Sequence, residues 1–117
     1  MRIIISLTIL LALAACGGGR SDGRSDTSAR VAFASGPMYD ACLAAGRKNA
    51  SRALCGCIQA QANRDLSARD QARAATFFAD PQRAQDTRQS DNSASEAFWK
   101  RYRAYANSAE QACRAAV

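Results

Sequence analysis

The fold of this chain is decided by residues 51–65, which read Ser-Arg-Ala-Leu-Cys-Gly-Cys-Ile-Gln-Ala-Gln-Ala-Asn-Arg-Asp. Alanine and straight-chain residues predominate here, and they give up little side-chain entropy in a helix. We therefore predict a helix from about residue 51 to residue 65. Its stripe at helical spacing is Leu54, Ile58 and Gln61, which is poor for a core. A small domain with so thin a core often needs covalent links.

The cysteines are well placed to supply those links. Side chains two positions apart on a helix point about 200° apart, so Cys55 and Cys57 are not expected to bond to each other. They flank the stripe, and each can reach a different neighbouring helix. Cys42 and Cys55 lie equally far from a turn expected near Lys48. We predict two disulfides, Cys42–Cys55 and Cys57–Cys113, while the exchanged pairing stays open.

Helix signals continue on the amino-terminal side of this stretch. A helix over about residues 37–45 would begin at a proline, which suits a first helical position, and Gly46 would close it. This helix would place Met38, Cys42 and Leu43 near one face.

Three further helices are predicted on the carboxyl-terminal side. The capping box of residues 67–70 starts a helix that ends near Ala79. Asp80 and Pro81 open a short helical segment, and a second capping box at residues 93–96 introduces the longest helix, to about Ala115. The stripe of that helix is Phe98, Tyr102, Tyr105, Ala109 and Ala112. No segment shows the alternation of apolar and polar residues that is typical of a strand. The predicted fold class is therefore all-α, a small bundle of about four or five short helices.

The composition argues against catalysis. The chain of 117 residues contains no histidine, the commonest general base and a common metal ligand. Ser/His/Asp and Cys/His nucleophiles and Cys/His zinc sites are thereby excluded. We predict a protein that is not an enzyme and that binds no cofactor and no metal.

A sharper interpretation of Cys55-Gly56-Cys57 is a thiol redox or soft-metal site, with Met38 as a thioether ligand for copper. A C-x-C spacing is a weak signal by itself. Structural disulfides already account for all four cysteines of the helical region in an oxidising compartment, and we prefer that interpretation.

The amino terminus predicts export and lipid anchoring. Residues 1–15 are typical of a cleaved signal peptide: Arg2 precedes an apolar run over residues 3–13, which is shorter than the roughly 20 residues of a membrane span. The four residues that start at the end of this run, Leu13-Ala14-Ala15-Cys16, resemble the bacterial lipobox. The resemblance implies diacylglycerol on the Cys16 thiol, cleavage before it and durable membrane attachment by acyl chains such as palmitate. Ordinary secretion after an A-x-A site is the alternative.

Residues 16–35 are predicted to form a flexible tether, and residues 36–117 the helical domain. The tether carries a tandem Gly-Arg-Ser-Asp repeat at residues 19–26, whose composition gives it nothing to bury. An apolar island at residues 31–33 either docks on the domain or stays loose. By resemblance to enterobacterial sorting, Gly17 favours the outer membrane, facing the periplasm.

The formal net charge is +6, and cleavage would remove one arginine and no acid, leaving +5. Such a surface favours weak binding to anionic envelope polymers or lipid headgroups. Trp99, Lys100, Arg101 and Arg103 form the candidate partner surface. Their mixture of aromatic and basic residues is also typical of nucleic-acid binders, but the predicted compartment argues against that partner. The preferred alternative is that the aromatic stripe of the longest predicted helix packs in the core with Arg101 and Arg103 in solvent, while Trp99 either covers the third helix or is an exposed contact.

The stretch from residue 42 to residue 114 resembles a family of small, uncharacterised alphaproteobacterial lipoproteins. The resemblance is carried by Ala-Ser-Arg-Ala-Leu-Cys-x-Cys at residues 50–57, Phe-Phe-Ala-Asp-Pro-Gln-Arg-Ala at residues 77–84 and Phe-Trp-x-Arg-Tyr at residues 98–102. Some members carry the label "arginine transporter". The sequence does not support literal transport, since no spanning helix follows the signal peptide, but an accessory role beside a transporter is compatible with it.

Three functions follow as hypotheses. The first is a membrane-anchored envelope lipoprotein that acts as a non-catalytic interaction or structural module. The second is an accessory component of solute (arginine) transport, although an arginine site would need carboxylates. The third is a thiol redox or copper-handling protein that uses Cys55 and Cys57.

Overall fold

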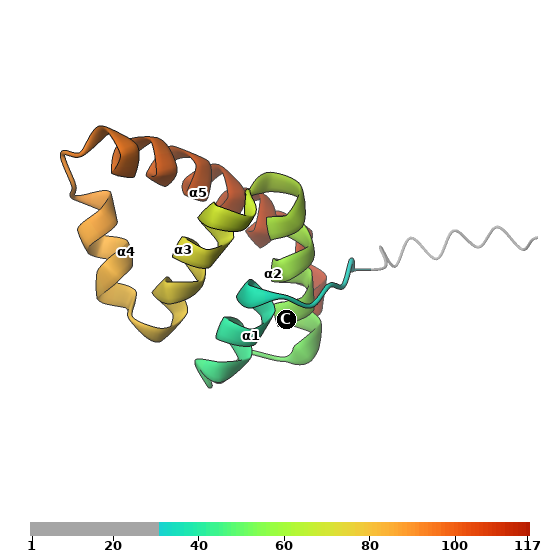
Figure 1. Cartoon of the computed structure of the whole chain (residues 1–117). Coiled ribbons are helices and arrows are strands. Elements are labelled where there is room, and N and C mark those ends of the chain that lie inside the picture. The colour runs from blue at the N-terminus through green and yellow to red at the C-terminus, as the bar shows by residue number, and fades with distance from the viewer. Residues whose placement is uncertain (1–30) are drawn as a thin grey trace, which may run out of the picture.

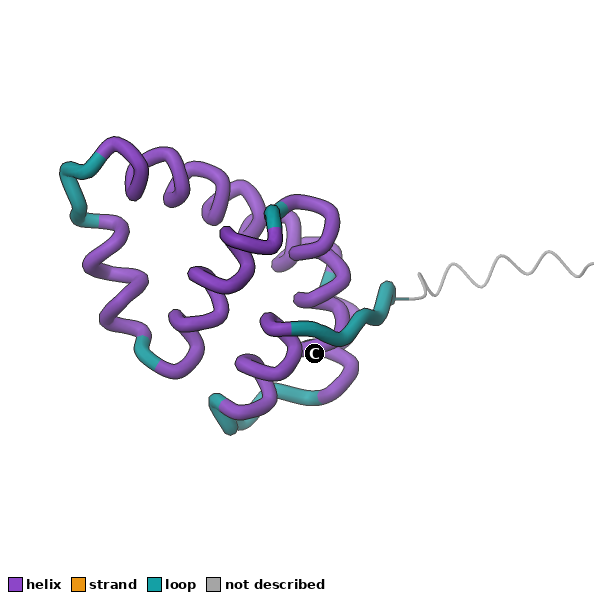
Figure 2. Tube along the Cα trace, in the orientation of Figure 1, coloured by secondary structure: helices purple, strands orange, loops and turns teal. Residues whose placement is uncertain are grey.

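A computed structural model describes residues 31–117, and over these residues the chain is all-helical, as predicted (Figures 1 and 2). The predicted signal peptide, the lipidation site Cys16 and most of the tether lie outside the described residues. The α-helices are α1 (Pro37–Ala44), α2 (Arg52–Asp65), α3 (Ala68–Ala79), α4 (Pro81–Arg88) and α5 (Ser93–Ala112), and a 3-10 turn follows at Arg114–Ala116. None of the helices among residues 31–117 combines the length and the apolar character that crossing a membrane requires.

The helix starts follow the capping residues in the sequence, with one correction. The Ser67 hydroxyl accepts the Asp70 N–H at the start of α3, and Asp80 caps α4. At α5 the predicted capping box at residues 93–96 is wrong. Asn92 is the cap, because its Oδ1 accepts two backbone N–H groups of the first turn, and Ser93 is therefore the first helical residue.

Helix α1 is capped from another helix. Gly36 precedes α1 with φ 152° and has no side chain to cap it. Instead, Oε1 of Gln59 on α2 accepts the N–H groups of Met38 at 2.7 Å and Tyr39 at 3.1 Å. A Cβ at Gly36 would lie 2.8 Å from the Gln59 amide, so this position requires glycine for close approach.

A buried amide network continues from Gln59 into α3. Its Nε2 donates to Gln71 Oε1 at 2.8 Å and to Asn63 Oδ1 at 2.9 Å. Gln71 in turn donates to the carbonyl groups of Ala62 and Leu66 at the end of α2. The network joins three helices, and no buried side-chain nitrogen or oxygen within residues 31–117 lacks a partner.

The buried face of α2 differs from the predicted stripe. Cys55, Gln59 and Ala62 are buried, whereas Leu54 and Ile58 are only half-buried. The physical reason is that the Cys55 disulfide and the Gln59 amide hold this face against α1 and α3. The true face therefore contains residues that a hydrophobicity pattern does not register.

The apolar core is formed by α1, α2, α3 and α5, and α4, at the left of Figure 1, connects α3 to α5. Its aromatic part is formed by Phe77 and Phe98, whose ring centroids lie 5.9 Å apart, and by Tyr102, 5.1 Å from Phe77. The buried apolar residues of the cluster are Met38, Ala62, Leu66, Ala74, Phe77, Phe98, Tyr105 and Ala109. The predicted α5 stripe is confirmed except at Ala112, which is exposed.

The apolar island before α1 docks on the domain. The N–H of Ala34 donates to the Gly56 carbonyl at 3.0 Å, and the Phe33 ring makes an edge-on contact with Tyr39 at 5.6 Å. Phe33 covers Gly56 so closely that a Cβ there would collide with the ring. Residues that precede the predicted domain boundary at 36 therefore pack on the bundle.

Candidate functional site

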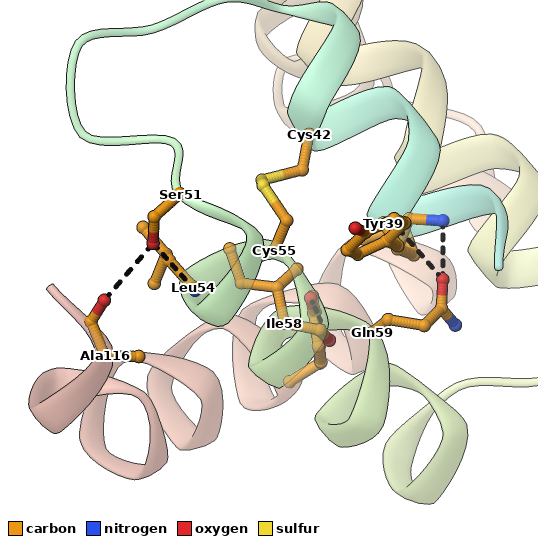
Figure 3. Close-up of a disulfide and its surroundings, with 10 residues drawn as sticks. Tyr39, Cys42, Ser51, Leu54, Cys55, Ile58, Gln59 and Ala116 are labelled. Atoms are coloured by element: carbon orange, nitrogen blue, oxygen red, sulfur yellow. Dashed lines mark hydrogen bonds between the residues drawn. A yellow bond between two sulfur atoms is a disulfide. The ribbon is translucent and has the colours of Figure 1, made fainter. Parts of the chain in front are cut away.

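Both predicted disulfides are present. Cys42 bonds to Cys55 with 5.6 Å between the Cα atoms, and Cys57 bonds to Cys113 with 5.7 Å. Figure 3 shows the first, which joins α1 to α2 beside a hydrogen bond from Ser51 to the Ala116 carbonyl. Together they fix the α1–α2 hairpin and tie α2 to the carboxyl terminus of α5.

The same geometry bears on the redox and copper hypothesis. Cys55 and Cys57 are bonded to different partners, and both are buried. Met38 is 1% exposed and lies in the core. Within residues 31–117 no group of three or more histidine, cysteine or acidic side chains could hold a metal ion. Both cysteines of the C-x-C motif are thus engaged in disulfides, one to α1 and one to the end of α5.

An open depression of about 370 Å³, here called the apolar groove, lies between α1, α2 and α5. It is formed where the half-buried side of α2, with Leu54 and Ile58, faces α5. Phe78 from the end of α3 closes one side. The residues that line it are Met38, Leu54, Ile58, Phe78, Tyr102, Tyr105, Ala106, Ala109, Glu110, Cys113, Arg114 and Val117.

Two tyrosines, Tyr102 and Tyr105, line the apolar groove. The Tyr105 hydroxyl donates to the Ile58 carbonyl at 3.2 Å. Burial raises the pKa of Tyr105 well above its ordinary value, with smaller contributions from Tyr102 and Asp65. Burial also raises the pKa of Tyr102. Both hydroxyls are therefore neutral at physiological pH, and the groove floor carries no charge.

The charges of the apolar groove lie at its carboxyl-terminal edge. Glu110 and Arg114 are exposed there. Val117 beside them is 80% exposed, and Phe33 at 61% is the other large apolar side chain exposed among the described residues. The groove thus combines an apolar floor with one acidic and one basic group at the rim.

The structure does not assemble the predicted partner surface as one patch. Lys100 and Arg103 are exposed, but Trp99 is half-buried and packs on the core, 5.3 Å from the ring of Tyr102. Arg101 lies on another side of α5, because residues two apart on a helix diverge by about 200°. Whether these four residues contact a partner stays a prediction.

Arg101 is instead paired with Asp70 of α3. Its Nε donates to Oδ2 at 2.6 Å and its Nη2 to Oδ1 at 3.1 Å. The hydrogen bonds from Arg101 hold the pKa of Asp70 below its ordinary value. Sequence reasoning missed this pair because Asp70 already had a local explanation as the last residue of a capping box. The second hydrogen bond of that capping box, from the Ser67 N–H to the Asp70 carboxylate, is absent because the carboxylate accepts from Arg101 instead.

A second depression, here called the arginine groove, lies between α3 and α5 and also has a volume of about 370 Å³. Its lining residues are Arg69, Asp70, Arg73, Ala94, Ala97, Phe98 and Arg101. Arg73 is half-buried; its Nη2 donates to Ser95 Oγ at 2.9 Å, and its guanidinium lies over the Phe98 ring, 4.4 Å from the centroid.

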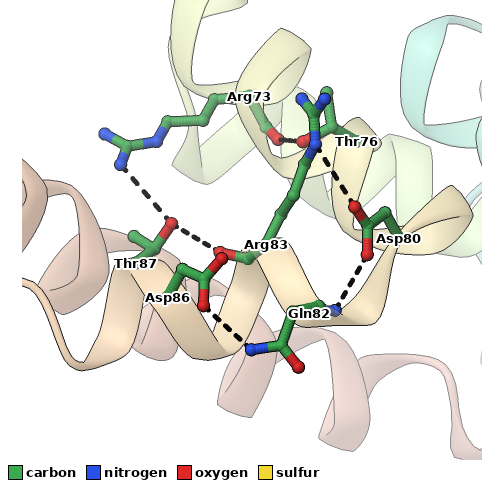
Figure 4. Close-up of polar contacts among 7 residues, drawn as sticks. All are labelled: Arg73, Thr76, Asp80, Gln82, Arg83, Asp86 and Thr87. Atoms are coloured by element: carbon green, nitrogen blue, oxygen red, sulfur yellow. Dashed lines mark hydrogen bonds and ion pairs between the residues drawn. The ribbon is translucent and has the colours of Figure 1, made fainter.

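Thr87 of α4 supports Arg73 from the other side. Arg73 Nη2 lies 3.4 Å from Thr87 Oγ1, and that hydroxyl donates to the Arg83 carbonyl at 2.8 Å (Figure 4). Arg83 itself pairs with Asp80 at 3.6 Å. Arg73 is thus held in place by α4 and α5 together, although sequence reasoning did not single it out.

Comparisons with known proteins found no matching family model, no matching curated protein and no matching solved structure. The resemblance to small lipoproteins therefore stays a prediction. The functional assignment rests on the two grooves, the disulfide frame and the charge distribution.

Proposed function

We propose that this protein is a non-catalytic interaction module of the bacterial cell envelope, held at the membrane by a lipid on Cys16. The proposal supposes an outer-membrane anchor with the helical domain facing the periplasm. It is supported by the signal-like residues 1–15, by the lipobox-like motif that ends at Cys16 and by disulfides, which persist in oxidising compartments. The tether predicted from the sequence would give the domain reach above the headgroups.

The apolar groove is the observation that carries the proposal. A concave, largely apolar surface of this size on a small domain marks an interaction site. We assign its occupant as a peptide segment of an envelope protein that presents apolar side chains and a neighbouring acidic residue. Arg114 at the rim and the positive net charge complement such a segment.

The frame around the apolar groove suits binding. Cys113 lines the groove and is bonded to Cys57, so the α5 wall is tied to α2. The Cys42–Cys55 disulfide holds α1 beside the same helix. A groove whose walls are fixed in advance loses little conformational entropy on binding, which favours affinity.

The two other hypotheses receive less support. A site for free arginine would need carboxylates to bind the guanidinium, but the apolar groove carries only Glu110 and the arginine groove only Asp70, which is occupied by Arg101. Redox or copper chemistry would need accessible thiols, and neither Cys55 nor Cys57 offers one.

Site-specific photo-crosslinking in intact cells tests the proposal. A crosslinking amino acid replaces Ala106, which lines the apolar groove, or Ala104, which is exposed two positions earlier on the same helix and outside this groove. We expect a discrete adduct with an envelope protein from position 106 and none from position 104. Membrane-located protein that gives no adduct at position 106, or the same adducts at both positions, would contradict the proposal.

A further inference from the structure

The arginine groove is separate from the apolar groove, with which it shares no lining residue. It combines three guanidinium groups, from Arg69, Arg73 and Arg101, with one carboxylate, from Asp70. Since Asp70 neutralises Arg101, the groove keeps an excess of two positive charges.

Arg73 is the only half-buried basic residue within residues 31–117, and it has no ion pair there. Its contacts are two hydroxyl groups and the face of the Phe98 ring, all of them neutral. Among residues 31–117 the ion pairs are Arg83–Asp80 and Arg101–Asp70, so no carboxylate pairs with Arg73. A half-buried guanidinium that is oriented but not neutralised is prepared for an anion from outside the chain.

The hydrogen bonds of Arg73 leave some of the N–H donors of its guanidinium group free. Both described bonds use Nη2, so Nε and Nη1 have no acceptor in the described part of the chain. Ala94 and Ala97 line the opposite wall with small side chains that leave the groove open. A planar guanidinium with free donors recognises carboxylate or phosphate oxygens with directional hydrogen bonds.

The field in the groove is positive from several sources. Arg101, Arg69 and Arg73 all lower the pKa of Asp70, so that their charges act on the same place. Arg69 lies in the first turn of α3, and Ala94 lies in the first turn of α5. The positive ends of both helix dipoles therefore border the groove and add to the arginine charges.

We propose that the arginine groove is a binding site for a phosphate monoester, with Arg73 as its oriented donor and Arg69 as a second cation at the rim. The excess of two charges matches a phosphate monoester, which carries about −1.5 to −2 at pH 7, better than a carboxylate. Such a group is found on the headgroup of phosphatidate and on soluble phosphate esters.

Calorimetry on the full chain in a nonionic detergent tests this site at low ionic strength, where exposed charges are least screened. The first probe is glycerol 3-phosphate, and the second is detergent micelles doped with phosphatidate, with phosphatidylcholine as the control lipid. We expect binding of a phosphate monoester that Arg73→Gln weakens about tenfold or more, as loss of one charge-assisted hydrogen bond implies.

Two further variants keep the test decisive if Arg73→Gln folds poorly. Arg69→Gln changes an exposed side chain and should weaken binding severalfold with an unchanged circular-dichroism melt. Arg88→Gln, at the exposed end of α4, removes the same charge elsewhere and should leave binding unchanged.

The two probes also distinguish the source of the phosphate. Binding to phosphatidate micelles alone assigns a lipid headgroup, and binding to both probes assigns any phosphate monoester; either result supports the site. Failure of wild-type protein to bind either probe would overturn the inference. Equal weakening by Arg69→Gln and Arg88→Gln would do so too, since it would show only diffuse charge attraction.

Discussion

Replacing Gln59 by methionine should strongly destabilise the domain, although the two side chains are similar in size. Gln59 is 1% exposed and makes four hydrogen bonds, as acceptor from the N–H groups of Met38 and Tyr39 and as donor to Asn63 and Gln71. Methionine has a similar length and fills the same space, so the change removes the polar contacts without opening a large cavity.

The expected loss follows from the groups left behind. The buried Met38 N–H would lose its acceptor, and Oε1 of Gln71 would lose its donor. A buried polar group without a partner costs about 1–3 kcal/mol, so two should lower the free energy of unfolding by about 2–6 kcal/mol. With about 4 kcal/mol as the central value, the melting temperature should fall by about 15–30 °C in a domain of this size.

Gln61 provides a matched control on the same helix. Its amide bonds only to Asp65, at the exposed surface, so Gln61→Met should change the free energy of unfolding by less than about 0.5 kcal/mol. Urea titrations followed by circular dichroism at pH 7 without reductant compare the two variants. A loss in Gln59→Met no greater than in Gln61→Met would refute the claim that the amide network stabilises the bundle.

Three other predictions concern separate contacts. Gly56→Ala should expel Phe33 and make the chain before α1 sensitive to protease. The global free energy of unfolding should stay within about 1 kcal/mol of wild type, because the higher helix propensity of alanine offsets the lost contact by about that much. Protection of the segment before α1 in limited proteolysis would contradict the contact. Asp70→Asn should cost about 1 kcal/mol at pH 7, since Arg101 is half-exposed. Because the fold lowers the pKa of Asp70, the ionised carboxylate stabilises the fold at pH values above its ordinary pKa of 3.8. This stabilisation is lost as the pH falls below 3.8, so urea titrations of wild type and variant should converge in acid. Burial raises the pKa of Tyr105, so the stability of the wild type should fall as the pH rises above the ordinary tyrosine pKa of 10.0. By about pH 11 the Tyr105→Phe variant should have lost less stability than the wild type. Equal losses would show that Tyr105 is not buried as described.

The sequence predicted the helices from local rules and their covalent links from helix geometry. Ser67 and Asp80 act as caps through their own side chains, and proline starts α1 as expected. Helix geometry argues against a Cys55–Cys57 bond, and the expected turn near Lys48 favours Cys42–Cys55 over the exchanged pairing. The helix caps need only residues within a few positions of each other, whereas the bonded cysteines lie 13 and 56 residues apart and their pairing depends on the expected arrangement of the helices.

The internal face of α2 and both grooves could not be predicted in the same way. Gln59 is polar and therefore resembles a surface residue, yet its partners on α1 and α3 make it part of the core. Arg73 and Arg101 differ in their pairing because the Asp70 carboxylate accepts hydrogen bonds from Arg101, across the interface between α3 and α5, and none from Arg73. Such roles depend on which helices meet, which local patterns do not specify.

Thiol trapping combined with intact-mass measurement tests the central claim, that this is an anchored module held together by two disulfides. The protein is extracted from membranes without reductant, and free thiols are alkylated. We predict a chain cleaved before Cys16, carrying acyl mass on that residue, with no alkylation at Cys42, Cys55, Cys57 or Cys113. Alkylation of Cys55 and Cys57 in the native protein, or a metal ion retained with them, would contradict the structural account and favour redox chemistry.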